Sequence, residues 1–268
     1  MVNHMFVVRT IKWLKSLVMK RWYSFISRSD TDGVLHFMNY GYEGSDPLTL
    51  NPEDEAERYS VQLYHHTADS VDLGDKDVLE VGCGRGGGIS YIHRYLKPAT
   101  AAGVDLNPDA IAFCRATYPG IGFHAMNAQK LDFPDESFDG VINVESSHVY
   151  PDFRAFVREV HRVLRPGGHF MISDFRPTRA VPSVEDEMHS AGFAIRLSET
   201  INDEVMAALK IDSERRVDLI RKYLPRALHG AAMEFAGPPG TKLYRSFEDG
   251  ERSYFRMVLQ KQERANGG

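Results

Sequence analysis

One short stretch, VLEVGCGRGGG at residues 78–88, restricts the folds open to this chain more than any other feature. An apolar run that ends in closely spaced glycines predicts a buried strand followed by a sharp turn into a helix. Gly82, Gly84 and Gly87 satisfy the spacing G-x-G-x-x-G, and glycines at such a turn let the backbone approach a ligand closely. The stretch therefore predicts a cofactor-binding turn at the end of a strand.

Strands and helices alternate after this turn. The strand-like segments lie at 77–82, 101–107, 121–127, 138–146 and 169–175, with helical patterns between them. Such alternation is typical of a mostly parallel sheet that helices cover on both faces. Together with two strands expected near the C-terminus, it predicts a Rossmann-like, doubly wound α/β fold with a seven-stranded sheet.

The regular alternation stops after residue 182. Residues 183–240 are predicted to form a helical cap for the acceptor, inserted into the fold. Asp249–Gly250 separates two strand-like halves and is a strong hairpin signal. We therefore expect four parts: an N-terminal amphipathic helix and lid at 1–53, a cofactor-binding core at 54–182, the helical cap at 183–240, and a C-terminal antiparallel hairpin at 241–268 that completes the sheet.

Residues 1–29 carry six basic and no acidic side chains, interleaved with apolar residues, which predicts a basic amphipathic helix. Three roles stay open for this helix. It could pack against its own domain, it could contact a membrane or a lipid substrate, or it could be a transit peptide. The net charge of −5 argues against a nucleic-acid partner. No apolar run approaches the ~20 residues that span a bilayer.

The two cysteines, Cys83 and Cys114, do not form a CxxC pair, so neither a disulfide framework nor a zinc site is expected. This cysteine usage favours a reducing cytosol. We therefore expect a cytoplasmic protein, associated with membranes only if residues 1–29 touch them. A homodimer is the expected oligomeric state on general grounds.

The glycine spacing alone does not identify the cofactor, because NAD enzymes share it. Asp105 lies 21 residues after Gly84 and is placed to accept hydrogen bonds from ribose hydroxyls in either case. Glu80, two residues before the first glycine, separates the two interpretations. A carboxylate there would repel a pyrophosphate but attract the ammonium and sulfonium groups of S-adenosylmethionine. The turn therefore favours S-adenosylmethionine, with Glu80 acting directly or by orienting the loop.

Four segments, VLEVGCGRGGG, GVDLNPDAI, NAQKLDFPDESFDGVINVES and VLRPGGHFMISD, follow one another over residues 77–175. In order and spacing this region resembles the class I S-adenosylmethionine-dependent methyltransferases. The resemblance implies that Asp105 holds the ribose diol, Leu106 packs on the adenine and Asn127 recognises the adenine amino group. The cofactor-binding set that it implies is Glu80, Gly82, Cys83, Gly84, Asp105, Leu106, Asn127, Ala128 and Asn143.

The acceptor side is predicted from NVESSHVYPDF at 143–153. His148 follows the fourth strand, where open α/β sheets bind their ligands, and an imidazole suits proton removal from a hydroxyl acceptor. Glu145 ends that strand beside the expected sulfonium. We therefore predict His148 as a general base, or as a residue that positions the acceptor, with Glu145 orienting it.

A narrower resemblance extends over about residues 34–260 and is carried by FMNYGYE (37–43), residues 63–92 and residues 143–168. These segments are similar to actinobacterial lipid and glycolipid O-methyltransferases, a group that includes the phthiotriol/phenolphthiotriol dimycocerosate methyltransferases and the rhamnosyl O-methyltransferases of glycopeptidolipid synthesis. The resemblance implies methylation of a hydroxyl on a sugar, glycolipid or lipid/polyketide-like acceptor. Tyr40, Tyr42 and Tyr150 are expected at the acceptor side, the first two in a lid.

Other interpretations stay open. A natural-product methyltransferase acting on a phenol or a carboxylate, such as a fatty acid, is one alternative, and a carbon or nitrogen methyltransferase is another. A carboxylate acceptor would not need His148, and a non-catalytic cofactor-binding scaffold is the remaining class. Glu145, His148 and Asp174 are candidate ligands for a divalent metal such as magnesium, although their spacing is not diagnostic.

Overall fold

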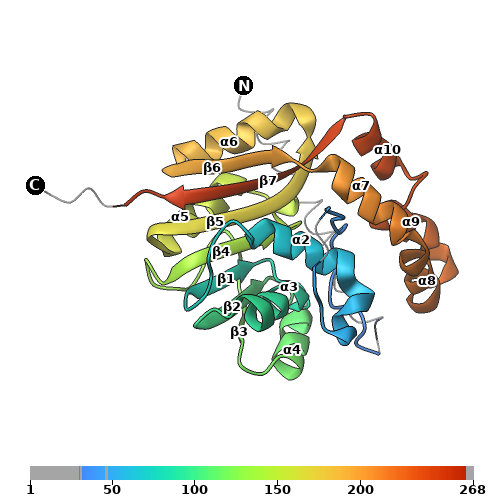
Figure 1. Cartoon of the computed structure of the whole chain (residues 1–268), viewed down its shortest axis with the longest axis horizontal. Helices are drawn as coiled ribbons and strands as arrows, with labels where there is room; N and C mark the ends of the chain where they lie inside the picture. The colour runs from blue at the N-terminus through green and yellow to red at the C-terminus, as the bar shows by residue number, and fades with distance from the viewer. Residues whose placement is uncertain (1–29, 31, 46–47, 264–268) are drawn as a thin grey trace, which may run out of the picture.

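The computed structural model of the chain describes residues 30, 32–45 and 48–263. A seven-stranded sheet runs through its centre, with helices on both faces (Figure 1). The basic helix predicted at 1–29 lies outside the described residues, so its alternative roles remain predictions. Among the residues that are described, no helix is long and apolar enough to cross a membrane.

The strand order in the sheet is β3-β2-β1-β4-β5-β7-β6. The first five strands of this order pair in parallel, whereas β7 runs antiparallel to both β5 and β6. The strands are β1 (Asp77–Val81), β2 (Thr100–Asp105), β3 (Gly122–Ala125), β4 (Phe138–Val144), β5 (Leu164–Pro177), β6 (Phe193–Thr200) and β7 (Arg252–Lys261). The predicted Rossmann-like α/β fold with a seven-stranded sheet is confirmed.

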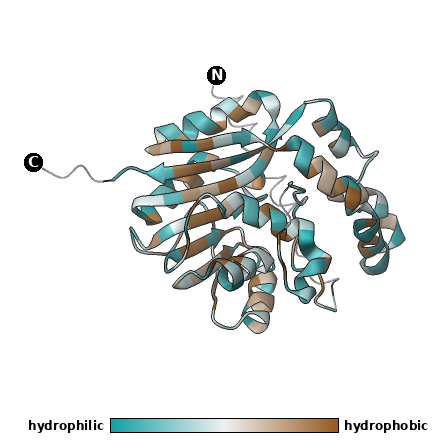
Figure 2. Cartoon of the chain, viewed as in Figure 1, coloured by the Kyte–Doolittle hydropathy of each residue, from teal (hydrophilic) through white to brown (hydrophobic). Residues whose placement is uncertain are grey.

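Alternation of side chains along the strands builds one core on each face of the sheet. Val78 of β1 belongs to one hydrophobic cluster and its neighbour Leu79 to the other, and hydrophobic colouring runs along the strands (Figure 2). The first cluster includes residues of α2 (Arg58–Ala68), α3 (Gly87–Tyr91), α4 (Pro108–Thr117), α7 (Asn202–Ile211) and α10 (Lys242–Glu248), and the second includes residues of α5 (Phe153–Val163) and α6 (Val181–Ser190).

Short helical turns complete the connections: the 3-10 turns η1 (Pro52–Glu57), η3 (Ser147–Val149), η4 (Thr178–Ala180) and η5 (Arg226–Leu228), and the π-helical turn η2 (Ile92–Leu96). Helix α4 begins as predicted at Pro108, and the preceding Asn107 accepts a hydrogen bond from the Asp109 N–H at 3.1 Å. That side-chain cap starts α4 directly after the end of β2, so the loop between them stays short.

The hairpin predicted at 241–268 is wrong, because its first half is helix α10. Thr241 caps this helix by accepting a hydrogen bond from the Tyr244 N–H, and Asp249–Gly250 follows it as a turn from helix to strand. Besides β5, the antiparallel partner of β7 is β6, which lies in the segment predicted to be all helical. Only Phe193 of this edge strand is buried, so its apolar signal in the sequence is weak.

The helical layer beyond the sheet consists of α7, α8 (Ser213–Tyr223), η5 and α9 (His229–Ala236), which lie together in Figure 1. The predicted cap is therefore confined to about residues 202–236, because α6 and β6 belong to the layers of the core. The N-terminal segment reaches this layer through a backbone hydrogen bond from the Glu43 N–H to the Glu204 carbonyl of α7, and the neighbouring Tyr42 N–H donates to the Tyr59 carbonyl of α2.

Candidate active site

A cavity of about 410 Å³ opens at the carboxyl ends of β1, β2 and β4, and we refer to it as the main cavity. Loops that leave parallel strand ends in this kind of sheet diverge and form a crevice for ligands. The predicted site residues that line it are Gly82, Cys83, Gly84, Asp105, Leu106, Asn127, Ala128, Glu145 and Tyr150. The predicted residues that do not line it are Tyr40, Tyr42, Glu80, Asn143 and His148.

The glycine turn presents bare backbone to the main cavity. Gly82 has φ +80°, and a Cβ placed there would lie 2.2 Å from the Ser146 Oγ. Gly84 has φ +51°, and the atom nearest to a Cβ there would be the Met38 Cε at 3.6 Å. Glycine adopts this left-handed backbone at the lowest cost. The turn is therefore a cradle in which a ligand can lie against the main chain.

Asp105 holds the turn from the end of β2. Its Oδ2 accepts a hydrogen bond from the Gly84 N–H at 3.0 Å, and its Oδ1 accepts one from the Asn107 N–H at 2.8 Å. Each carboxylate oxygen has a second lone pair, so the group can also accept hydrogen bonds from two ribose hydroxyls. The neighbouring Leu106 side chain is 48 % exposed at the cavity wall, which suits packing against an adenine. These residues fit S-adenosylmethionine.

Asn127 and Ala128 lie at the part of the wall that follows β3. The Asn127 Oδ1 accepts hydrogen bonds from the backbone N–H of Gln129 at 3.0 Å and from its side-chain amide at 3.2 Å. Gln129 lines the main cavity as well. Adenine recognition by Asn127 remains a prediction, and Gln129 is a neighbouring amide that the sequence analysis did not consider.

Glu80 lies behind the glycine turn, fully buried on β1. Its Oε1 accepts a hydrogen bond from the Tyr64 O–H at 2.6 Å, and the Ile89 backbone N–H also bonds the carboxyl group. Burial raises the pKa of Glu80 to about 7, although both hydrogen bonds act in the opposite direction. Of the two roles predicted for Glu80, these contacts match orientation of the loop.

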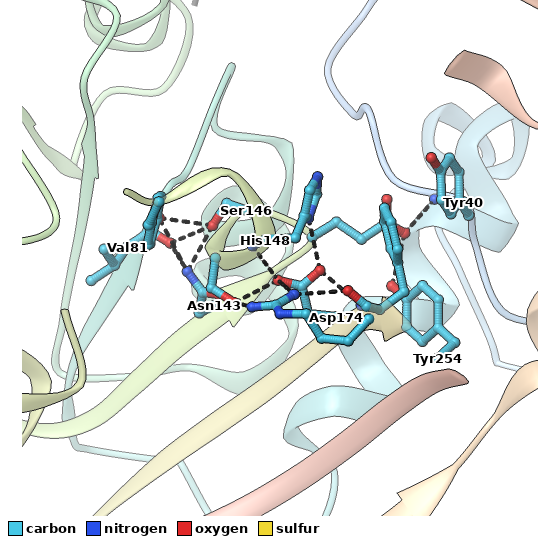
Figure 3. Close-up of polar contacts among 12 residues, drawn as sticks. Tyr40, Val81, Asn143, Ser146, His148, Asp174 and Tyr254 are labelled. Carbon is cyan, nitrogen blue, oxygen red and sulfur yellow. Dashed lines mark hydrogen bonds and ion pairs between the residues drawn. The ribbon is translucent and has the colours of Figure 1, made fainter. Parts of the chain in front are cut away.

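Asn143 is fully buried behind the same wall. Its Nδ2 donates to the Val81 carbonyl and to the Ser146 Oγ, both at 2.7 Å (Figure 3). Ser146 in turn lies 2.9 Å from the hydroxyl of Tyr150, which lines the main cavity. Asn143 therefore connects β4 to the end of β1 and supports the two hydroxyl groups that face Gly82.

Glu145 joins the N-terminal segment to the sheet at the edge of the main cavity. Its Oε1 accepts hydrogen bonds from the Tyr40 backbone N–H at 2.6 Å and from the Tyr254 O–H at 2.7 Å (Figure 3). Its φ of +44° is uncommon for a residue other than glycine. Burial raises the pKa of Glu145 to about 8. The prediction that Glu145 orients His148 is therefore wrong, because Glu145 is bonded to Tyr40 and Tyr254 instead.

Asp174, at the end of the adjacent strand β5, holds His148 instead (Figure 3). The His148 Nδ1 lies 2.8 Å from the Asp174 Oδ1, and the His148 backbone N–H donates to Oδ2 at 3.0 Å. Burial alone would raise the pKa of Asp174, but the Arg176 guanidinium, the His148 ring and the Ser147 hydroxyl outweigh it and hold that pKa well below its usual range. An ionised Asp174 favours the proton on Nδ1, so the lone pair of the neutral ring is on Nε2.

A lid covers the glycine turn and consists of Asp30 and residues 32–42. Residues 36–39 of the lid line the main cavity. The fully buried carboxylate of Asp30 pairs at 2.8 Å with Arg85, which belongs to the turn itself and is 3 % exposed. The Arg85 guanidinium also lies 3.6 Å from the centre of the Phe113 ring. A buried ion pair therefore ties the beginning of the lid to the cofactor-binding turn.

The two predicted lid tyrosines have different surroundings. Tyr40 is buried, with its ring centre 5.4 Å from that of Phe175 and 6.3 Å from that of Phe247. Tyr42 stacks on His66 at 4.1 Å between ring centres. Tyr40 thus packs the lid against Phe175 and Phe247 in the interior, whereas Tyr42 packs on α2 away from the main cavity.

Metal ligation has no support among the described residues, where no three His, Cys, Asp or Glu side chains are grouped to hold an ion. The Asp174 oxygens accept from Ser147, His148 and Phe175 and face Arg176. The contact of Asp174 with His148 is the main feature of the site that the sequence analysis missed. The position of Asp174 at the end of the strand next to His148 was the available signal, because neighbouring parallel strands end at the same edge.

Comparison with known proteins identifies the family of the chain. A family described as "Methyltransferase domain" matches residues 79–172. The chain is 43 % identical over 241 residues to a phthiotriol/phenolphthiotriol dimycocerosates methyltransferase of Mycobacterium tuberculosis, covering 88 % of this chain and 89 % of the relative. It is 40 % identical over 236 residues to a fatty-acid O-methyltransferase of Mycolicibacterium smegmatis, covering 87 % and 85 %.

The fold has solved counterparts. A geranyl diphosphate C-methyltransferase from Streptomyces coelicolor, crystallised with S-adenosyl-L-homocysteine, superposes with a TM-score of 0.62 at 18 % identity, over 92 % of this chain and 97 % of that chain. The fold is that of a class I S-adenosylmethionine-dependent methyltransferase. Within that class, the chain belongs to the family that contains the mycobacterial phthiotriol/phenolphthiotriol dimycocerosates methyltransferases.

Proposed function

We propose that the enzyme methylates a hydroxyl oxygen on an acceptor that carries a long hydrocarbon part, such as a lipid, glycolipid or polyketide-like molecule. The names of the two relatives support an acceptor of lipid type. The observation that carries the hydroxyl assignment is the 2.8 Å contact of His148 Nδ1 with the buried Asp174. A hydroxyl is a weak nucleophile while protonated, and this pair supplies a base with a defined orientation.

The proposed cofactor contacts divide among the walls of the main cavity. Asp105 accepts from the ribose hydroxyls, Leu106 packs on the adenine, and the backbone at Gly82 and Gly84 lies along the methionine part. S-adenosylmethionine supplies a methyl group already activated on a positively charged sulfur. The protein therefore mainly has to position the acceptor and accept its proton.

His148 takes the proton in this proposal. Its Nε2 accepts the hydroxyl proton as the oxygen forms its bond to the methyl carbon and the carbon–sulfur bond breaks. The Asp174 carboxylate, 2.8 Å from Nδ1, keeps the ring oriented with Nε2 free to accept the proton. Glu145 holds the lid through Tyr40, which keeps water away from the reacting groups.

A second candidate is methylation of a fatty-acid carboxylate. It is favoured by the relative named as a fatty-acid O-methyltransferase. A carboxylate is already ionised near neutral pH and needs no base. The two candidates therefore differ in their dependence on His148.

The test measures S-adenosylhomocysteine release by the wild type and by His148→Ala with saccharides, long-chain alcohols and long-chain fatty acids. With a hydroxyl acceptor we expect His148→Ala to lower kcat by about 10²- to 10⁴-fold. His189→Ala is the matched control, because His189 is exposed on α6. Undiminished turnover of an alcohol by His148→Ala would rule out the base, and turnover of fatty acids alone would establish the second candidate.

A further inference from the structure

A second cavity of about 110 Å³ adjoins the main cavity, and we refer to it as the cap cavity. Phe37, Met38 and Asn39 of the lid line both cavities. The lid segment is therefore the partition between them. A molecule whose reacting group lies in the main cavity has the cap cavity as a neighbouring volume for its remaining atoms.

The wall of the cap cavity is largely hydrocarbon. Helices α8 and α9 contribute Leu219, Ile220, Tyr223, Ala232 and Phe235. In α8 only Ile220 is buried and in α9 only Ala232. The other apolar side chains on this wall still have surface that a ligand could remove from water. Burial of that surface by an apolar chain would be favourable in proportion to its area.

The charged residues of the cap cavity are already paired. Arg215 contacts Glu57 at 2.8 Å and Asp212 at 2.6 Å, and Arg216 contacts Asp212 at 3.0 Å. This network does not require a charge on the ligand, because each of these cations faces a carboxylate of the protein. The chemistry of the cap cavity therefore suits an uncharged chain.

Arg216 also fixes the partition. Its Nη2 donates to the backbone carbonyls of Asn39 and Tyr40, both at 3.1 Å. The same Tyr40 donates its N–H to Glu145 at the edge of the main cavity. The lid segment between the two cavities is thus attached to Arg216 of α8 on one side and to Glu145 on the other. The position of a chain in the cap cavity is therefore coupled to the position of the reacting group.

We infer that the cap cavity binds the hydrocarbon chain of the lipid acceptor, next to the reacting oxygen in the main cavity. The inference rests on the proposed function for the identity of the acceptor. Ala232 is the position that tests it, because this residue lines the cap cavity and is 3 % exposed. Ala231, the preceding residue of α9, is exposed and provides a matched control.

The experiment measures displacement of a dansyl-labelled undecanoic acid from the full-length protein saturated with S-adenosylhomocysteine. The competitors are linear primary alcohols of increasing length. For the wild type we expect affinity to rise by about fourfold per added methylene until the cavity is full. Ala232→Phe should weaken binding of the longer alcohols at least tenfold, and Ala231→Phe should bind them as the wild type does. All proteins should bind S-adenosylhomocysteine equally.

Equal affinity of Ala232→Phe and the wild type, or wild-type affinity independent of chain length, would overturn the inference. If Ala232→Phe no longer binds S-adenosylhomocysteine, the smaller substitution Ala232→Val replaces it in the test. Its affinity for the longer alcohols is again compared with that of the wild type, and the expected loss of affinity is smaller. Methyl transfer to the same alcohols is measured in parallel. Binding of the alcohols without methyl transfer would refute the proposed function and leave the inference about the cap cavity standing. Methyl transfer that Ala232→Phe does not impair would refute the inference about the cap cavity and leave the proposed function standing.

Discussion

Replacing Glu80 by glutamine tests how the fold holds a fully buried carboxyl group. The Glu80 Oε1 accepts from the Tyr64 O–H, while Oε2 has no hydrogen-bond partner among the described residues. Such surroundings favour the neutral acid, and burial raises the pKa of Glu80 from 4.5 to about 7. Glutamine has nearly the same shape as the neutral acid and can accept the same hydrogen bond from Tyr64, but it cannot ionise.

The magnitude follows from linkage between protonation and folding. The folded chain retains the Glu80 proton at pH values where the unfolded chain has lost it, so the stability contributed by Glu80 is complete below about pH 4.5 and is lost as pH rises through about 7. At about 1.4 kcal/mol per pH unit, the shift corresponds to roughly 3 kcal/mol. Between pH 5 and pH 8, the stability of Glu80→Gln relative to the wild type should rise by roughly 2 to 3 kcal/mol.

Urea denaturation followed by circular dichroism at pH 5 and at pH 8 measures this difference. Glu214→Gln is the control, because Glu214 is exposed on α8, and its stability should follow the wild type at both pH values. Parallel pH dependence of Glu80→Gln and the wild type would refute the argument. A variant that becomes less stable than the wild type as pH rises would show that Glu80 is ionised and favourably paired in the fold.

Two further predictions concern the lid. Asp30→Ala removes the carboxylate that pairs with the buried Arg85 guanidinium, so we expect the free energy of unfolding to fall by about 3 to 5 kcal/mol, measured by urea denaturation. A loss below 1 kcal/mol would show that the ion pair is not stabilising. Glu145 has a pKa raised to about 8 and lines the main cavity, so a sulfonium bound there should lower that pKa and release protons at pH 7. Calorimetry in two buffers of different ionisation enthalpy should show greater proton release for S-adenosylmethionine than for S-adenosylhomocysteine, and the difference should disappear in Glu145→Gln; equal release for both ligands would contradict the assignment.

Sequence reasoning succeeded where the signal is local. The strand before Gly82, the helix start at Pro108 and the alternation up to β5 depend on residues that are close in the chain. The same reasoning failed at β6 and α10. The edge strand β6 buries only Phe193, and the Thr241 cap of α10 was obscured by aromatic residues that resemble a strand.

The sequence by itself determined the α/β class, the glycine turn and the carboxylate of Asp105, because each is expressed in neighbouring residues with a restricted conformation. Only the tertiary structure decided that Asp174 rather than Glu145 orients His148, and that the lid separates two cavities. These features join residues from different strands and from the two ends of the chain. Their contacts depend on which strand ends become neighbours when the sheet is wound and on how the cap packs against the lid, and no local pattern encodes either.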